Sequence, residues 1–444
     1  MTTTKGELFD ILKSVRIAPF LLIAACYVTW GFTNDIIGVT VSAFEHIFNL
    51  NALEGTYVNI ANALGYFTLS IPAAVYMMRY TYKSGVLFSL GIYALGIAML
   101  LPAKYHGEFY GFLMAYYMMT CGTAALETCC HPLVYHMGDE RRGIFRLNLV
   151  QTFNSLGAVV GMYVATAFVK KGLSPMPIEQ RIQLPKAQAD VLKTHDLNVV
   201  TEPYMYIAAA LLVLIVLIRV TKMPAAYDER SSKGPLTAFR ELLHVKNYRN
   251  GLMAEFFYIG AQICCLTFIT TYTRMVLTAE DMFAADVEML VSKVNLIAIV
   301  TFATMRLVCT LIILYVKPGR LLIMMGAIAL MTTVGAIVFN DRNGIWCLII
   351  TCGAMSMMFP TIYGMALRGM DSNIKYASAG LTMTVSAGAV FPTLQATVID
   401  MNISFLGLSA VNLSFIVPMI CFIIVTIYGH TGYVRHNITH DYVS

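Results

Sequence analysis

The sequence is poor in charged residues. Asp, Glu, Lys and Arg make up 12% of its 444 residues, whereas about a quarter of the residues in soluble proteins are charged. Hydrophobic residues make up 58% of the chain, and its mean hydropathy is +0.69. This composition excludes a soluble globular protein and indicates a polytopic membrane protein. The net charge of +5 forms no basic patch, so no nucleic-acid partner is expected.

Motifs that would identify other classes of protein are missing. The chain has no HExxH, GxSxG or Cys/His metal-binding spacing, so we expect neither an enzyme, a bound metal nor an organic cofactor. Its ten cysteines lie inside apolar segments and predict no disulfide framework. The N-terminal segment MTTTKGELFDILKSVRIAPF lacks the features of a cleaved signal peptide, so the first apolar segment should remain as a helix.

Long apolar windows predict the architecture, because about 20 apolar residues in a helix cross a bilayer. Twelve such windows are present, which predicts an all-α polytopic protein with two six-helix halves. Their expected spans are 17 to 43, 54 to 78, 84 to 103, 109 to 136, 145 to 169, 203 to 221, 250 to 273, 287 to 315, 320 to 339, 344 to 367, 376 to 400 and 405 to 429.

The connections between spans predict domains and orientation. A basic segment, 222–249, separates an N-terminal half (1–221) from a C-terminal half (250–444), as in two-half transporters with a substrate site at the membrane midplane. Lys and Arg concentrate on the face that carries the N-terminus, so both termini should be cytoplasmic in a cell (inner) membrane. The other long connection, 170–203, carries a charged, helical-looking run around Lys186 to His195 and should lie outside as a lid or spacer.

Charged side chains inside the spans are candidate functional groups, because each costs about 2.5 to 3.5 kcal/mol at the bilayer centre. The deep carboxylates are those of Asp35, Glu127 and Glu255. Glu255 lies near the predicted cytoplasmic end of its span, so interfacial snorkelling is an alternative to a role in the cavity. The deep cations, Lys293 and Arg306, are expected to form a gate or a structural ion pair rather than to bind substrate.

A hairpin from 124 to 158 concentrates polar groups at one depth. Glu127 and Asn154 both lie about 16 Å from the cytoplasmic turn, at 1.5 Å per residue. His131 follows Glu127 by one helical turn, and Gln151 precedes Asn154 on one helix face. Carboxylates and amides together suit a neutral polyol better than an ion. The alternatives are that the amides tie helices together and that His131 is a packed core residue.

Several motifs resemble the fucose:proton symporter family of the major facilitator superfamily, over nearly the whole chain. The most specific is RLNLVQTFNSLGA, and ALET followed by a proline is the next. The matching stretches are WGF (Trp30 to Phe32), YKSG (Tyr82 to Gly85), ALET with its proline (Ala125 to Pro132), RLNLVQTFNSLGA (Arg146 to Ala158), YIGAQ (Tyr258 to Gln262) and FPTIY (Phe359 to Tyr363).

The resemblance implies proton-driven uptake of a fucose-like sugar or hexose by alternating access, powered by the proton gradient, in a monomer surrounded by lipid. It implies that Glu127 couples protons in the central cavity. Three further residues, Tyr258, Gln262 and Phe359, are expected to face the sugar by stacking or hydrogen bonding, although core packing is an alternative. The expected sugar-binding residues are Gln151, Asn154, Asn34, His131, Glu255, Tyr258, Gln262 and Phe359.

The sequence departs from the family at the first helix. Fucose permeases carry an essential aspartate at the position that matches Gly38, and here that carboxylate is missing. Asp35 lies one turn earlier, and we expect it to take over proton coupling together with Glu127. His131 and Glu255 add titratable groups where the family has amides. Two other functions remain open, namely export of a sugar or drug by proton antiport and sugar sensing without transport.

Overall fold

The computed structural model describes residues 17–50, 52–139, 142–176, 178–181, 183–223, 234–280, 282–370, 373–405 and 407–435. Within these ranges the regular structure is helical, and the one β-type contact is an isolated bridge between Phe405 and Leu408. The predicted all-α architecture is therefore confirmed. Part of the central basic segment, residues 224–233, lies outside the described residues.

The described helices account for the twelve predicted spans. Eleven of them are long and apolar enough to cross a membrane. The remaining predicted span, 109 to 136, coincides with helix α6 (Phe109–His136). Tyrosines, threonines, Glu127 and His131 interrupt the apolar residues of α6, so it is not among those eleven. Two of the predicted site residues, Glu127 and His131, lie on it.

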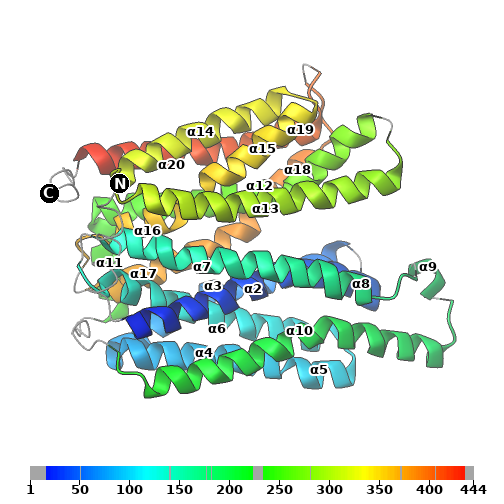
Figure 1. The fold of residues 1–444 in the computed structure, drawn as a ribbon, viewed down its shortest axis with the longest axis horizontal. Coiled ribbons are helices and arrows are strands. Elements are labelled where there is room, and N and C mark those ends of the chain that lie inside the picture. The colour runs from blue at the N-terminus through cyan, green and yellow to red at the C-terminus, as the bar shows by residue number, and fades with distance from the viewer. Residues whose placement is uncertain are drawn as a thin grey trace, which may run out of the picture. The chain divides into compact units, whose positions relative to one another are not determined.

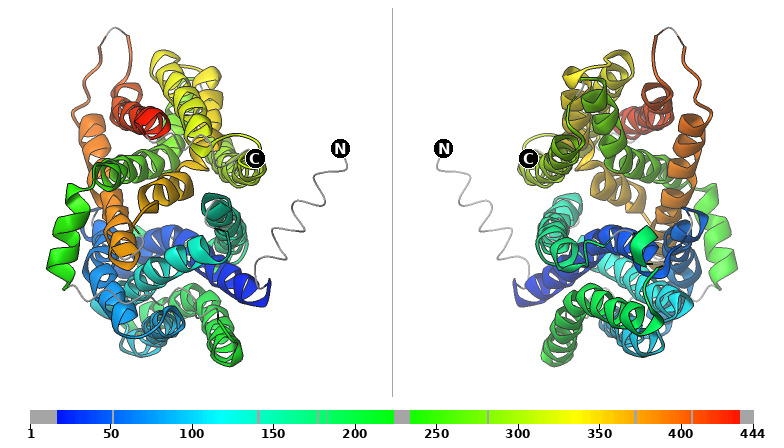
Figure 2. Two further views of the ribbon diagram at one scale, coloured as in Figure 1. Left: turned by 90° about the vertical axis from the view of Figure 1, so that its left-hand side faces the viewer. Right: turned by 90° about the vertical axis from the view of Figure 1, so that its right-hand side faces the viewer.

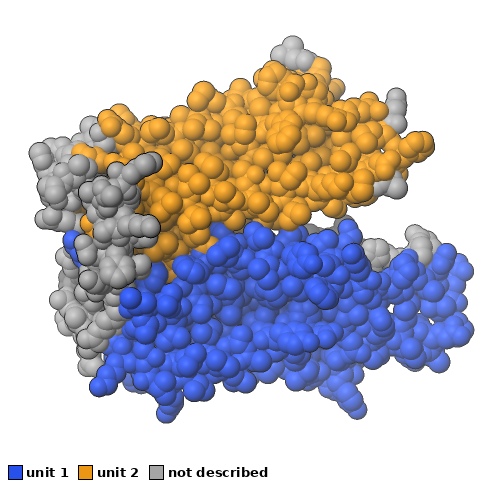
Figure 3. Space-filling view, viewed as in Figure 1, with its two compact units in different colours: residues 1–139, 153–235 blue, residues 140–152, 236–444 orange. Residues whose placement is uncertain are grey.

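The chain divides into two compact units (Figure 3). Unit 1 comprises residues 1–139 and 153–235, and unit 2 comprises residues 140–152 and 236–444. Helix α7 (Gly143–Val164) is shared, because its first residues belong to unit 2 and the rest belong to unit 1. The predicted halves, 1–221 and 250–444, differ from this division chiefly at that segment of α7.

Unit 1 is a bundle of long helices that run alongside one another (Figure 1). Helix α6 packs against α3 and α4, and α10 packs against α2 and α4. Besides α6 and the end of α7, the unit contains α2 (Ile17–Phe48), α3 (Ala52–Arg79), α4 (Tyr82–Ala98), α5 (Leu100–His106), the π-helix η2 (Ala165–Val169), α8 (Lys170–Gly172), α9 (Ile178–Arg181) and α10 (Lys186–Val220).

Helix α6 lies at the centre of unit 1 because its neighbours approach it at small residues. A Cβ atom on Gly122 would lie 2.4 Å from the backbone nitrogen of Tyr93, and one on Gly96 would lie equally close to that of Met119. The glycines thus let α4 and α6 meet backbone to backbone. As a result most of α6 is buried, including Glu127 and His131.

Helix α10 corrects the prediction for the loop between 170 and 203. The expected helical run around Lys186 to His195 is present, but it is continuous with the sixth span, so much of the expected lid or spacer is an extension of that span. Its polar residues lowered the hydropathy of this segment, although they do not prevent a helix outside the hydrocarbon. Asp196 anchors the connection before it: this buried carboxylate pairs with Arg181 at 2.8 Å and accepts a hydrogen bond from the Ser174 backbone N–H at 2.9 Å.

Unit 2 is a second helical bundle, and Figure 2 shows its helices and those of unit 1 end-on. Helix α12 is its hub, because it contacts α13, α15, α16, α18 and α20. The helices after the shared segment of α7 are α11 (Pro235–His244), α12 (Lys246–Ala279), α13 (Ala284–Ile312), α14 (Pro318–Val338), α15 (Arg342–Met355), α16 (Met358–Leu367), α17 (Ile374–Met383), the 3-10 helix η4 (Thr384–Ser386), α18 (Ala387–Asp400), α19 (Ala410–Ser414) and α20 (Ile416–Arg435).

Asp196→Ala should destabilise the protein, because it leaves the guanidinium of Arg181 largely buried without its carboxylate. We expect a loss of about 3 kcal/mol in the free energy of unfolding, measured by denaturant titration in detergent. Asp190→Ala is the matched control, because Asp190 lies exposed on the same helix. Equal stability of the two variants would contradict the anchoring role of Asp196.

Candidate functional site

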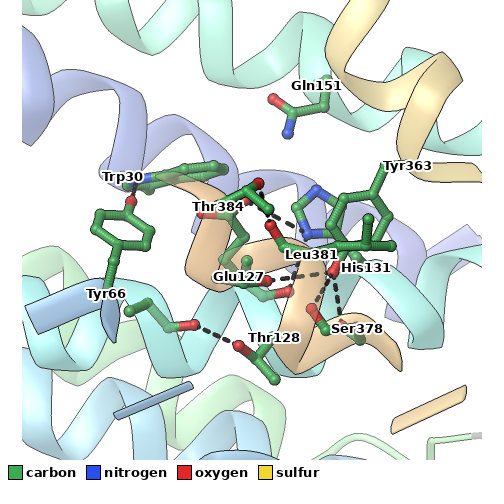
Figure 4. A network of polar contacts seen from close by, with 12 residues as sticks. Trp30, Tyr66, Glu127, Thr128, His131, Gln151, Tyr363, Ser378, Leu381 and Thr384 are labelled. Atoms are coloured by element: carbon green, nitrogen blue, oxygen red, sulfur yellow. Dashed lines mark hydrogen bonds and ion pairs between the residues drawn. The ribbon is translucent and has the colours of Figure 1, made fainter. Parts of the chain in front are cut away.

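The predicted acid Glu127 is fully enclosed in unit 1. Its side chain lies within helix α6, and neither carboxylate oxygen has a hydrogen-bond partner among the described residues. His131 lies one turn away, with Nδ1 at 3.9 Å from Oε1 of Glu127 (Figure 4). The same nitrogen bonds the backbone oxygen of Glu127 at 3.0 Å, so Nδ1 carries the hydrogen. The carboxylate therefore has unused acceptor capacity in a buried environment.

Two aromatic residues border this carboxylate. Trp30 Nε1 donates a hydrogen bond to the Tyr66 hydroxyl at 3.2 Å (Figure 4). That hydroxyl lies near the carboxylate of Glu127, outside hydrogen-bonding geometry, and near the side chain of Asn34. The Trp30 and Tyr27 rings meet the His131 imidazole edge-on, at centroid distances of 6.5 and 5.6 Å. Trp30, Tyr66, Glu127 and His131 thus form one cluster, which we call the acid cluster.

Sequence reasoning missed Tyr66. A tyrosine in an apolar span is ordinary, and nothing near Tyr66 in the sequence indicates that its hydroxyl reaches α6. The signal would have been the polarity of the hydroxyl itself, because a buried Tyr O–H usually finds a polar neighbour. The predicted role of Trp30 was limited to the family motif, whereas the structure also gives its indole N–H a partner.

Asp35 lies on a different face of α2 from Trp30 of the acid cluster, whereas Asn34 follows Trp30 by one helical turn and lies near the same Tyr66 hydroxyl. Asn34 is exposed and Asp35 is half-buried, and the carboxylate of Asp35 has no hydrogen bond or ion pair within the described part of the chain. Gly38, three residues further along the same face, is also exposed, and a Cβ atom there would have no neighbour within 4 Å. The first helix therefore presents a half-buried acid, and its expected role in proton coupling stays a prediction.

Asn154 belongs to the close contact between α2 and α7 in unit 1. A Cβ atom on Gly31 would lie 2.0 Å from the backbone oxygen of Asn154, and one on Gly157 would lie 2.2 Å from that of Val28. The Asn154 amide is half-buried and donates a long hydrogen bond, 3.4 Å, to the backbone oxygen of Tyr27. This amide thus lies beside the first helix and could still bind a ligand.

The predicted residues of unit 2 gather around a buried guanidinium. Arg306 on α13 donates to the backbone oxygen of Ser356 at 2.7 Å, and its side chain lies near Tyr258. Tyr258 donates to the backbone oxygen of Met355 at 2.9 Å, and its ring lies 6.5 Å from that of Phe359. Both rings are buried, so each is partly committed to packing and to the local backbone.

Gln151 belongs to this group rather than to the acid cluster. Its backbone oxygen and its Oε1 accept hydrogen bonds from Nη1 of Arg306 at 3.2 and 3.4 Å. The residue is buried in unit 2, whereas Asn154, on the same helix, belongs to unit 1. The sequence placed both amides on one helix face and did not reveal that the chain divides between them.

The structure tests the expectations for the other charged residues. Glu255 is fully buried, so the alternative of interfacial snorkelling is wrong, and its nearest charged or phenolic groups include Tyr258 and Tyr428. Arg306 takes part in no ion pair among the described residues, and Lys293 is exposed, so the predicted ion pair is also wrong. Gln262 is half-buried on α12, one turn beyond Tyr258.

Comparison with known proteins identifies the family of this fold. The sequence profile of the Major Facilitator Superfamily matches residues 22–393. The chain belongs to this superfamily. An L-fucose-proton symporter of Haemophilus influenzae is 36% identical over 425 residues, which are 94% of this chain and 97% of that protein. A glucose/galactose transporter of Brucella abortus is 24% identical over 411 residues, 91% of each chain.

A solved structure supports the same fold. The crystal structure of a single-residue variant of the Escherichia coli fucose:proton symporter matches with a TM-score of 0.84 and 25% identity, covering 94% of this chain and 99% of that one. The major facilitator fold and membership of the resembled family are therefore confirmed. These relatives are transporters rather than enzymes, as the sequence predicted. The roles of the individual site residues stay predictions.

Gly31→Ala should force α2 and α7 apart, because its Cβ would overlap the backbone of Asn154. We expect the free energy of unfolding to fall by about 1 to 3 kcal/mol and sugar uptake to fall with it. Gly38→Ala is the control on the same helix, because its Cβ meets no neighbour. The temperature of thermal unfolding in detergent distinguishes the two variants. A Gly31→Ala protein that unfolds at the wild-type temperature would contradict the close contact.

Proposed function

We propose that this major facilitator protein is a proton-coupled symporter that takes up a fucose-like sugar by alternating access. The observation that carries the proposal is the Glu127 carboxylate, buried in α6 without a hydrogen-bond partner among the described residues. A buried ionised carboxylate in that state is costly, so the site favours a proton or a hydrogen-bond donor. The similarity to an L-fucose-proton symporter over nearly the whole chain supports a sugar as that donor.

Proton coupling in this proposal uses two acids of unit 1. Asp35 is half-buried and takes a proton from the external medium, while Glu127 is enclosed and becomes neutral when that proton reaches it. Neutralisation removes the cost of a buried charge and favours closure around the sugar. When the site opens to the cytoplasm, where the pH is higher, the carboxylates lose their proton to it. No organic cofactor or metal takes part, and the proton gradient supplies the energy.

Sugar recognition in this proposal combines amides with aromatic rings. Asn34 and Asn154 in unit 1, and Gln262 in unit 2, are exposed or half-buried and can exchange hydrogen bonds with hydroxyl groups. Trp30 of the acid cluster and Phe359 offer ring faces for the apolar side of a sugar. The protein functions as a monomer in a cell (inner) membrane with both termini in the cytoplasm, where most Lys and Arg residues of the connections then lie.

Asp35→Asn and Glu127→Gln should each abolish accumulation of sugar against its gradient, because an amide cannot carry the proton. Exchange of labelled for unlabelled sugar should persist, since the amides keep hydrogen-bonding groups. Uptake of radiolabelled L-fucose by energised vesicles, compared with exchange in vesicles without a gradient, distinguishes the two processes. Concentrative uptake by both variants would overturn the proposed coupling.

Gly38→Asp should restore accumulation when it is combined with Asp35→Asn. The position has no neighbour within 4 Å of an added Cβ and lies on the same helix face as Asp35, so a carboxylate fits there. We expect the double variant to regain accumulation that Asp35→Asn alone lacks, because it returns a titratable carboxylate to this helix face. Gly38→Asn in the same background is the control, and equal rescue by both would exclude a proton-carrying role at this face.

A further inference from the structure

The short helix α11 runs in a different direction from the long helices of unit 2. It ends at His244, and only Val245 separates it from α12, which begins at Lys246 and is one of the candidate membrane spans. Figure 2 shows the long helices of unit 2 end-on, whereas α11, in bright green, is seen from the side. Because a single residue joins it to the start of a span, α11 is placed to lie along the surface of the bilayer.

One face of α11 is attached to the start of α17 within unit 2. Ala238 is fully buried on this face, and the ring of Phe239 lies 5.9 Å from that of Tyr376. The carboxylate of Glu241 accepts a hydrogen bond, 3.3 Å long, from the amide of Asn373, the residue before α17. These contacts fix the rotation of α11 about its own axis and so determine which of its residues face outwards.

The outward face of α11 combines apolar and basic side chains. Leu236 and Leu243 are 86% and 45% exposed, and Arg240 and His244 are exposed as well. These four residues share one face, because they follow one another at steps of four, three and one residues. The leucines lie along one edge of the face and the basic residues along the other. An apolar edge beside basic side chains is typical of a helix that lies in a membrane interface.

Charge indicates which partner suits this face. The basic residues continue into the start of α12, where Lys246 and Arg249 are also exposed. The one acid of α11, Glu241, is turned towards Asn373 instead. A basic surface next to a membrane span is complementary to the phosphates of anionic lipids. A free phosphate ion would satisfy the basic residues but leave the leucines in water, whereas the surface of an anionic bilayer accommodates both.

We propose that α11 is an interfacial helix that binds anionic phospholipid. Leu236 and Leu243 lie at the boundary between acyl chains and headgroups, while Arg240 and His244 contact the lipid phosphates. Because the opposite face of α11 is attached to α17, the bound lipid also holds the start of the eleventh predicted span at the membrane surface. The proposal does not depend on the proposed sugar transport.

Hydrogen–deuterium exchange of residues 235–244 tests the proposal in the purified full-length protein. The protein is compared in nanodiscs of phosphatidylcholine and in nanodiscs of an equal mixture of phosphatidylcholine and phosphatidylglycerol. We expect exchange to be about fivefold slower in the anionic discs, the factor that one basic residue near an anionic surface contributes. Inorganic phosphate added to the phosphatidylcholine discs should not slow exchange, and equal slowing by phosphate would overturn the bilayer as the partner.

The double variant Arg240→Gln with His244→Gln should exchange at equal rates in the two kinds of disc. Thr237→Ala is the matched control, because it changes an exposed uncharged residue of the same helix and should keep the difference. A less stable helix in the double variant would speed exchange in both discs, so the ratio of the two rates remains the test. A persistent difference in the double variant would overturn the proposal. Equal rates in wild-type protein would also overturn it, and slow exchange in both discs would indicate that another protein segment covers this face.

Discussion

The hydrocarbon core of a membrane offers no hydrogen-bond partner, so each polar group within a span must be satisfied by the protein or kept for a ligand. This constraint organises both units. In unit 1 the hydroxyl of Tyr204 accepts from that of Tyr116 at 3.1 Å and bonds Thr40 at 3.4 Å. Such bonds join α2, α6 and α10. The carboxylate of Glu127 is one of several buried groups without a hydrogen bond among the described residues, and His131 is its ion-pair neighbour at 3.9 Å. The cost of burying its charge supports the proposed role in proton coupling.

The same constraint distinguishes two kinds of polar side chain in unit 2, those that tie helices together and Arg306. Tyr363 bonds the hydroxyl and backbone oxygens of Ser378 at 2.7 and 3.0 Å and ties α16 to α17 (Figure 4). The Tyr248 hydroxyl bonds the backbone oxygen of Ala377 at 3.0 Å. Each of these bonds joins two helices of unit 2. Arg306 differs, because its partners lie on the broken tenth span and on the segment of α7 whose helix continues into the other unit.

The sequence predicted the parts of the fold that depend on local composition. Apolar windows identified the spans, and the window 109 to 136 matched α6. The helical run from Lys186 was predicted, but its continuity with the sixth span was missed, because hydropathy marks where a helix enters hydrocarbon rather than where it begins. Pro360 was visible in the sequence, but it leaves the carbonyl of Ser356 without a helical donor, and the replacement donor Arg306 lies 50 residues from Ser356. Tyr66 and the division of α7 between the units depend in the same way on distant contacts.

The sequence predicted which types of residue form the site better than it predicted how they are arranged in space. Glu127 is enclosed and Asp35 half-buried, a difference that the sequence did not predict, and Gln151 lies with Arg306. The central claim is that sugar enters together with protons. It is tested most directly by adding L-fucose to de-energised cells or vesicles containing the protein and recording the external pH. The account predicts alkalinisation of the medium that depends on the sugar. Sugar entry without a pH change, or acidification, would contradict it.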